Sequence, residues 1–380
     1  MIVRKPPMGW NSWNTFGANI NEKVVMETAD AIVEKGLKAA GYEYVVIDDC
    51  WSLPKRDENG MIVADPVKFP HGMKYVADYV HSKGLKFGMY SCDGSHTCAG
   101  YPGSFDHEFT DARMFADIGV DFLKYDNCWK PQCIPVKLLY NRMSMALKAT
   151  GRDILFSACN WGSEEVHHWI RSTGAHMFRS TGDIYDNFVS ARDIAISQLD
   201  KLEYSGNNCF NDLDMLICGI KGTGNVGIQG CTPEEYALHF ALWCLMGSPL
   251  MLGVDVRTID DETLSLVTNP QLIALDQDEE ARPPMVIHNN SQKAFTFFRH
   301  LDNGEYAVGY FNMDDEARHM RFETYDVGLG VNGGYDFEFT DMMTGNVIKH
   351  VREYENFWLE AHTFKLFRAK LVPAEVPARG

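Results

Sequence analysis

Apolar positions in the first part of the chain recur with a helical period, and each such stretch leads into a short apolar run. Asn21 is placed to cap a helix whose buried face would be formed by Val25, Ala29, Ile32 and Val33. Gly36 lies near the end of that helix, and the apolar run 44–47 follows it. This order predicts a helix followed by a strand.

The same order returns further along the chain. A second helix is predicted from Met73, Val76, Ala77 and Val80, with a strand at 85–90, and a third helix precedes a strand at 120–123. Further strands are predicted at 9–13, 44–47, 154–157, 176–179, 215–217 and 250–252. Strands that alternate with helices form parallel sheets, and eight of them favour a closed (β/α)8 barrel, the TIM barrel fold, within an α/β class.

Beyond residue 280 the apolar positions recur at every second residue, as they do in β-strands. The runs 295–298 and 306–310 flank Asn303-Gly304, a dipeptide typical of hairpin turns. Further strand-like runs occur at 335–339, 347–351 and 363–367. We therefore predict a catalytic barrel over residues 1–280 and an antiparallel β-sandwich over residues 281–380.

Composition and charge exclude several partners. The chain has 380 residues, of which 45% are hydrophobic, and its 35 basic against 52 acidic side chains give a formal charge of −17. Such a charge repels nucleic acid and anionic lipid surfaces. The first residues lack an apolar signal core and no apolar run is long enough to span a membrane, so we expect a cytoplasmic protein that binds no membrane.

The ten cysteines do not form a metal-binding pattern. No His-Glu-x-x-His or Cys-x-x-Cys motif occurs, and the histidines fall mainly in predicted loops and helices. We expect no metal and no cofactor. Trp51, Trp129 and Trp169 are interpreted as packing residues, since large aromatic side chains mostly fill cores.

Carboxylates, aromatic residues and cations gather where the predicted strands end. In a (β/α)8 barrel these ends meet on one face, which holds the active site. Sugar sites combine carboxylates that bind hydroxyls with aromatic rings that stack on the sugar. The residues at or just beyond the strand ends are Trp10, Asp48, Asp49, Tyr90, Lys124, Asp126, Trp161, Arg179 and Asp183.

Two of these carboxylates suit glycosidic cleavage, which needs one carboxyl group on each side of the anomeric carbon. Lys124 lies two residues before Asp126 on one predicted strand, so both side chains should face the same way and the lysine should keep Asp126 ionised. Asp183 follows Gly182, where the backbone can approach a substrate closely. We predict Asp126 and Asp183 as the catalytic pair.

Five segments in order resemble glycoside hydrolase family 27, the α-galactosidases and α-N-acetylgalactosaminidases, over nearly the whole chain. They are Met8-Gly9-Trp10-Asn11-Ser12-Trp13, Ile47-Asp48-Asp49-Cys50-Trp51, Lys124-Tyr125-Asp126-Asn127-Cys128, Cys159-Asn160-Trp161-Gly162 and Arg179-Ser180-Thr181-Gly182-Asp183. The resemblance implies a retaining exo-α-galactosidase with Asp126 as nucleophile and Asp183 as acid/base.

The resemblance also implies the remaining roles in the site. Asp48 and Asp49 would hold the galactose 4- and 6-hydroxyls, and Trp10 would form the floor. Lys124 and Arg179 would hold further hydroxyls. The walls would be Tyr90, Cys159, Trp161 and Met215. Family members commonly join the cysteine after the nucleophile to one on the preceding loop, here Cys128 and Cys98, although a reducing cytoplasm opposes such a bridge.

Several alternatives stay open at this stage. Asn160 stands where some members carry a glutamate near the sugar 2-position, so an α-N-acetylgalactosaminidase remains an alternative. A β-L-arabinopyranosidase could use the same machinery, although both Asp48 and Asp49 favour a sugar with a 6-hydroxyl. A non-catalytic sugar-binding protein would lack one catalytic carboxylate, and both are present. The expected partner is an oligosaccharide with a terminal galactose, and the sandwich either packs on the barrel or mediates a homo-oligomer.

Overall fold

Eight parallel strands form the central sheet of the N-terminal domain in the computed structural model, which describes residues 3–374. Around the sheet they follow the order β10-β1-β2-β3-β4-β5-β6-β8. The strands are β1 (Met8–Asn11), β2 (Tyr44–Val46), β3 (Lys86–Cys92), β4 (Phe122–Asp126), β5 (Leu155–Cys159), β6 (Met177–Arg179), β8 (Phe210–Asp212) and β10 (Leu250–Leu252).

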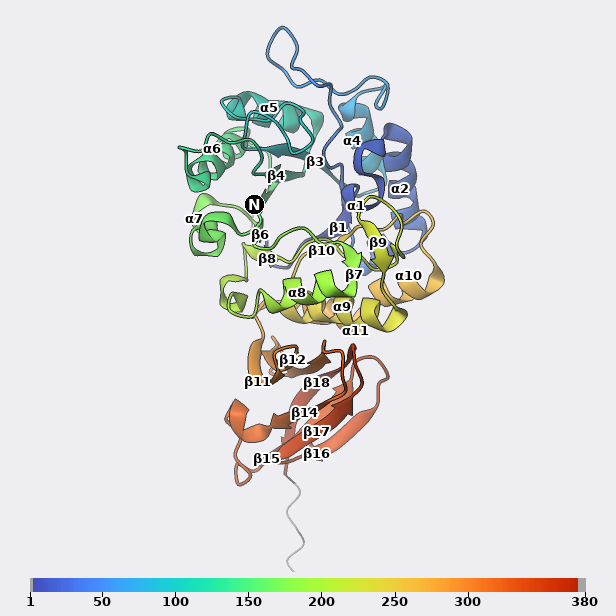
Figure 1. Cartoon of the computed structure of the whole chain (residues 1–380), viewed down its shortest axis with the longest axis vertical. Helices are drawn as coiled ribbons and strands as arrows, with labels where there is room; N and C mark the ends of the chain where they lie inside the picture. The colour runs from blue at the N-terminus through green and yellow to red at the C-terminus, as the bar shows by residue number, and fades with distance from the viewer. Residues whose placement is uncertain (1–2, 375–380) are drawn as a thin grey trace, which may run out of the picture.

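Hydrogen bonds next to β10 close this sheet into a barrel. The Leu216 amide donates to the Met251 carbonyl at 2.8 Å, and the Gly253 amide donates to the Leu216 carbonyl at 3.0 Å. Figure 1 shows the helices arranged as a ring outside the strands. The predicted (β/α)8 barrel is confirmed.

The helices of this domain follow the strands in the predicted alternation. They are α1 (Trp13–Phe16), α2 (Glu22–Glu34), α3 (Leu37–Ala40), α4 (Met73–Ser82), α5 (Glu108–Ile118), α6 (Val136–Ala149), α7 (Ile170–Thr173), α8 (Phe188–Ile196), α9 (Pro233–Met246), α10 (Asp261–Val267) and α11 (Pro270–Asp276). Asn21 caps α2 by accepting from the Val24 amide at 3.1 Å, as predicted. Val33 is exposed, against prediction, because it lies about 100° around the helix from the buried Ile32.

The seventh barrel strand lies earlier than predicted. It is β8, at 210–212, whereas the predicted run 215–217 makes a single parallel bridge, from Leu216 to Leu252. The extended backbone is interrupted at Asp214, whose φ of 81° is a left-handed conformation that ends a strand. The apolar run is therefore buried core but not part of a continuous strand.

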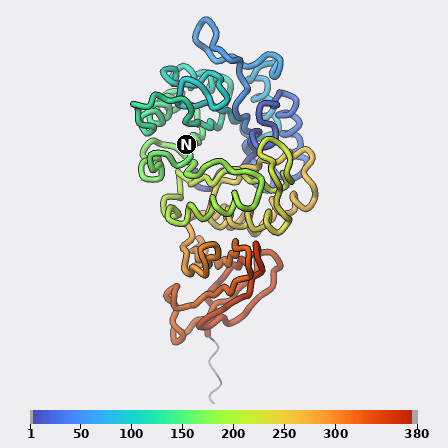
Figure 2. The backbone as a smooth tube through the Cα atoms, in the orientation of Figure 1, coloured from blue at the N-terminus to red at the C-terminus, as the bar shows by residue number. Residues whose placement is uncertain are grey.

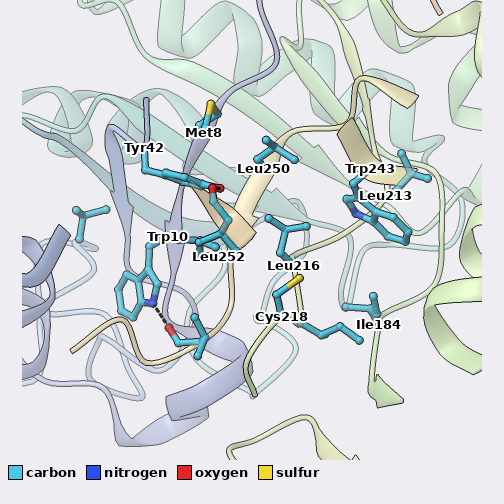
Figure 3. Packing of buried hydrophobic residues seen from close by; sticks show 14 of the residues in the cluster. Met8, Trp10, Tyr42, Ile184, Leu213, Leu216, Cys218, Trp243, Leu250 and Leu252 are labelled. Carbon is cyan, nitrogen blue, oxygen red and sulfur yellow. Dashed lines mark hydrogen bonds between the residues drawn. The ribbon is translucent and has the colours of Figure 1, made fainter. Parts of the chain in front are cut away.

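The barrel core is filled by apolar side chains from strands and surrounding helices. Figure 3 shows part of this cluster, in which Leu252 and Leu216 lie between Trp10 on one side and Trp243 on the other. Trp10 and Tyr42 are fully buried and each satisfies its polar atom, since the Trp10 indole donates to the Val254 carbonyl at 2.9 Å and the Tyr42 hydroxyl to the Val267 carbonyl at 2.7 Å. This rigid wall supports the strand ends that carry the site.

The C-terminal domain is antiparallel and has two layers. One layer is the six-stranded sheet β11-β12-β13-β18-β15-β16, and the other is the pair β14-β17. The strands are β11 (Met285–Ser291), β12 (Ala294–His300), β13 (Tyr306–Asn312), β14 (Arg318–Glu323), β15 (Tyr335–Asp341), β16 (Val347–Val351), β17 (Tyr354–Leu359) and β18 (Thr363–Pro373). The β12–β13 hairpin turns through Gly304 at a φ of 78°, as the Asn-Gly dipeptide predicts.

The two domains share one hydrophobic cluster. Phe297 and Phe311 of the sandwich belong to the same buried cluster as Leu245 and Trp243 of α9. Arg299, also buried, donates to the Cys244 and Leu245 carbonyls at the end of α9, at 3.2 and 2.9 Å. Figure 2 shows the sandwich below the barrel, against its last helices. Within residues 3–374, no helix has the length and apolar character needed to cross a membrane.

Candidate active site

A cavity of about 300 Å³ opens at the carboxyl ends of the barrel strands, a size at the lower end for small-ligand sites. Ten of the eleven residues predicted for catalysis and sugar binding line it, together with Cys98. The lining residues are Trp13, Asp48, Asp49, Tyr90, Cys98, Lys124, Asp126, Cys159, Trp161, Arg179, Asp183, Ile184, Tyr185, Asp214, Met215, Asn225 and Val226. Residues from most of the barrel strands therefore meet at one concave site.

Trp10 is the predicted site residue that does not line the cavity. Side chains alternate along β1, so Asn11 points inward and donates to Asp48 at 2.7 Å, while the Trp10 ring packs against Phe16 in the surrounding core. Trp13, three residues later, lines the cavity instead. The prediction of Trp10 as a floor is wrong, and Trp13 is the tryptophan from this segment that a ligand can reach.

Asp126 lies at the end of β4 and is almost fully buried. Its carboxylate accepts hydrogen bonds from the Tyr90 hydroxyl at 2.9 Å and from the Asn127 amide at 3.0 Å. Burial raises the pKa of Asp126 to about 6, although the charge of Lys124 and the Tyr90 hydrogen bond act to lower it. The carboxylate is thus ionised at neutral pH but protonated in mildly acidic solution.

This shift predicts an acid limb in the pH profile. If Asp126 is the nucleophile that the sequence predicts, it must be ionised, and kcat/KM for an aryl α-galactoside should then fall about tenfold per pH unit below pH 6. Tyr90→Phe removes a donor that favours the ionised form, so the limb should move to higher pH. Initial rates at low substrate concentration between pH 4.5 and 8 measure both profiles.

Tyr125→Phe is the matched control for that profile. Tyr125 neighbours Asp126 on β4, but its hydroxyl is buried and has no hydrogen-bond partner within residues 3–374. Its removal should leave the limb in place. An acid limb near pH 4, or one that Tyr90→Phe does not move, would contradict the assignment of this limb to Asp126.

Lys124 and Asp48 form a buried ion pair beside Asp126. The Lys124 ammonium donates to Asp48 at 2.7 Å, so its direct partner is Asp48. Burial acts to lower the pKa of Lys124, but the charge of Asp48 raises it above its ordinary value. The lysine therefore stays charged and acts on Asp126 through space.

Asp48 and Asp49 follow β2 and both line the cavity. The Asp49 carboxylate accepts from the Cys50 amide at 2.7 Å and from the Ala99 amide at 3.0 Å, which fixes its position. Burial raises the pKa of Asp49. Two adjacent, immobilised carboxyl groups are suited to bind neighbouring hydroxyls of one sugar ring.

Asp183 lies at the mouth of the cavity, where its side chain is 61% exposed. Arg179 contacts Asp183 and the buried Asp214, each at 3.0 Å. Asp214 also accepts from the Ile184 amide at 2.8 Å and so holds the backbone next to Asp183. Of the five aspartates that line the cavity, Asp183 is thus the one near solvent, whereas Asp126 and the other three are buried.

The loop after β3 is joined to the loop after β4 by a disulfide. Cys98 and Cys128 are bonded, with their Cα atoms 5.2 Å apart. Together with Asp126 they bring three potential metal ligands close together, but sulfurs in a disulfide carry no thiolate to bind a metal. Trp129, next to Cys128, is 68% exposed, so its interpretation as a packing residue is wrong.

Asn160 does not line the cavity, although Cys159 and Trp161 on either side of it do. Its side chain is fully buried, and its amide nitrogen donates to the Ser163 carbonyl at 2.7 Å. The alternation of side chains along β5 and beyond explains this orientation. Asn160 is therefore not available to contact a ligand in this cavity.

Several lining residues were missed from the sequence. Asp214 lies in the stretch Asn211-Asp212-Leu213-Asp214-Met215, whose density of acidic residues was a usable signal. Tyr185 and Ile184 follow Asp183 directly and could have been found by extending the last motif. Asn225 and Val226 had no such signal, because they reach the cavity through hydrogen bonds to the Asn14 carbonyl, at 2.9 and 3.1 Å, far away in sequence.

Comparisons with known proteins agree with this fold and show the family. A model of the alpha galactosidase A family matches residues 5–278. The α-galactosidase of Cyamopsis tetragonoloba is 50% identical over 279 residues, which cover 73% of this chain and 66% of that protein. Alpha-galactosidase A of Cellvibrio japonicus is 42% identical over 333 residues, which cover 85% of this chain and 79% of that protein.

Similarity extends to a solved structure. The crystal structure of α-galactosidase I from Mortierella vinacea has a TM-score of 0.89 and 31% identity, over 98% of this chain and 99% of that one. A barrel with a carboxylate-lined cavity and these relatives defines a glycoside hydrolase. The chain belongs to glycoside hydrolase family 27, the family of the α-galactosidases.

Proposed function

We propose that the chain is a retaining exo-α-galactosidase with Asp126 as nucleophile and Asp183 as acid/base. The observation that carries this proposal is the placement of a buried and an exposed carboxyl group in one small cavity. Retaining cleavage needs a nucleophile against the anomeric carbon and a proton donor where the leaving group departs to solvent. Asp126 suits the first role and Asp183 the second.

The reaction proceeds in two displacements. A carboxylate oxygen of Asp126 bonds to the anomeric carbon while the bond from that carbon to the aglycone oxygen breaks, and Asp183 gives its proton to the departing oxygen. Asp183, now ionised, takes a proton from water, whose oxygen bonds to the anomeric carbon as the bond to Asp126 breaks. Each displacement inverts the carbon, so α-galactose is released.

The proposal assigns galactose to this cavity because of its polar groups. In it Asp48 and Asp49 bind the 4- and 6-hydroxyls, and Lys124 and Arg179 donate to further oxygens of the sugar. Trp13 offers an apolar face to the sugar in place of Trp10. Arabinopyranose lacks the 6-hydroxyl and would leave a buried carboxyl group without its ligand, which costs binding energy.

A substrate panel tests the proposal. The enzyme should hydrolyse aryl α-galactoside with a higher kcat/KM than aryl α-N-acetylgalactosaminide or aryl β-L-arabinopyranoside. Proton NMR during the first minutes should show α-galactose before it mutarotates. Initial release of β-galactose would exclude the two-step mechanism, and a preference for either other sugar would replace galactose as the substrate.

A further inference from the structure

The acid/base side of the cavity carries an aromatic residue to which none of the predicted roles applies. Tyr185 lies two residues after Asp183, lines the cavity and is 49% exposed. Trp161, on the loop after β5, lines the same cavity. An aromatic ring that is half exposed in a concave site is positioned for contact with a ligand.

The backbone that carries Tyr185 is fixed. Its amide donates to the Ser190 hydroxyl at 3.0 Å, and the next amide, of Asp186, donates to the Val226 carbonyl at 3.0 Å. The short strands β7 (Asp186–Asn187) and β9 (Gly227–Gly230) pair here, as Figure 1 shows. A ring on an ordered backbone loses little conformational entropy when it binds a ligand.

Apolar residues accompany this ring in the cavity. Ile184, directly before Tyr185, and Val226, whose carbonyl accepts from the Asp186 amide, both line it. The Asp183 side of the cavity therefore combines apolar and polar groups, which suits a ligand with both hydroxyls and C–H faces.

Charge restricts the ligand further. The lining contains five aspartates, Asp48, Asp49, Asp126, Asp183 and Asp214, against Lys124 and Arg179 as its only lysine and arginine within residues 3–374. Lys124 is paired with Asp48, and Arg179 with Asp183 and Asp214. Such a site disfavours uronates and sugar phosphates and favours a neutral ligand.

We propose that Tyr185 stacks on the sugar unit to which the galactose is joined, so that the preferred substrates are neutral oligosaccharides with a terminal α-galactose. This inference rests on the proposed function. If Asp183 protonates the glycosidic oxygen, the aglycone must lie beside Asp183 and hence beside Tyr185. The ring takes the C–H face of the second sugar, with Trp161 on the same cavity as a further aromatic wall.

Two substrates with alkyl leaving groups separate this role from catalysis. An α-(1→6)-galactosyl disaccharide reaches the ring, whereas the aglycone of methyl α-galactoside is too small to stack on it. Tyr185→Ala should lower kcat/KM for the disaccharide by about tenfold, mainly through KM, and should change the value for the methyl galactoside less than about twofold. Tyr185→Phe keeps the ring and should retain the wild-type preference.

Tyr325→Ala is the matched control, because Tyr325 is a more exposed tyrosine on the sandwich. It should leave both substrates unaffected. Equal losses on both substrates in Tyr185→Ala, no loss on the disaccharide, or a loss in Tyr185→Phe as large as in Tyr185→Ala would each overturn the stacking role alone. A wild-type enzyme that hydrolyses neither substrate would overturn the proposed function as well.

Discussion

Replacement of Asp126 by asparagine should reduce kcat for an aryl α-galactoside by about four orders of magnitude, which is typical for loss of a nucleophile. The amide has nearly the same shape but cannot form the glycosyl ester. Asp126 is buried at the end of β4 and its pKa is raised by that burial, so an uncharged side chain should not destabilise the fold. Initial rates and thermal unfolding measured on the same preparation check both expectations.

A rescue experiment shows whether the lost group is the nucleophile. In Asp126→Gly, azide can occupy the space that the carboxylate leaves, and it should restore turnover of an activated aryl α-galactoside. A single displacement inverts the anomeric carbon, so the product should be β-galactosyl azide. Asp117→Asn, on the exposed side of α5, is the control and should keep full activity. Substantial activity in Asp126→Asn without azide would remove Asp126 from the mechanism.

Asp183→Asn should affect substrates according to their leaving groups. An alkyl aglycone needs a proton as it departs, so kcat/KM for a galactosyl disaccharide should fall about 10³-fold. Dinitrophenolate departs without a proton, so kcat/KM for the dinitrophenyl galactoside should fall less than about tenfold. The second displacement also needs Asp183, so the glycosyl-enzyme should accumulate and produce a burst of dinitrophenolate in rapid-mixing experiments.

Asp193→Asn provides the comparison for this variant. Asp193 lies on the neighbouring helix α8, is largely exposed and pairs with Arg192 outside the cavity. Both substrates should be hydrolysed at wild-type rates. If Asp183→Asn lowered kcat/KM equally for both leaving groups, proton donation would have to be assigned to another residue.

The spacing of apolar residues was sufficient to predict the architecture, because most helices and strands bury one face and that face sets the spacing. The apolar positions of α4 and the cap of α2 are where the spacing predicts them. The prediction of a strand at 215–217 was wrong because of the local backbone conformation. An apolar run shows that a segment is buried, but it does not contain the left-handed backbone conformation of Asp214, which interrupts the strand.

Within the site, the sequence identified residue types at strand ends better than their directions. Alternation along a strand placed Lys124 and Asp126 correctly on one side. The same alternation turns the side chains of Trp10 and Asn160 away from the cavity. The partner of Lys124 could not be predicted either, because Asp48 follows β2, two strands away from β4 around the barrel, and only the folded geometry brings the two side chains together.

Arg299 couples the unfolding of the barrel to the unfolding of the sandwich. The last carbonyls of a helix have no partner within the helix, and at the end of α9 two of them accept from this sandwich residue. A barrel separated from its sandwich would lose the two hydrogen bonds from Arg299 and would uncover Leu245 and Trp243. Unfolding should therefore occur as one cooperative transition of the whole chain, in which damage to the sandwich lowers the population of folded catalytic barrel.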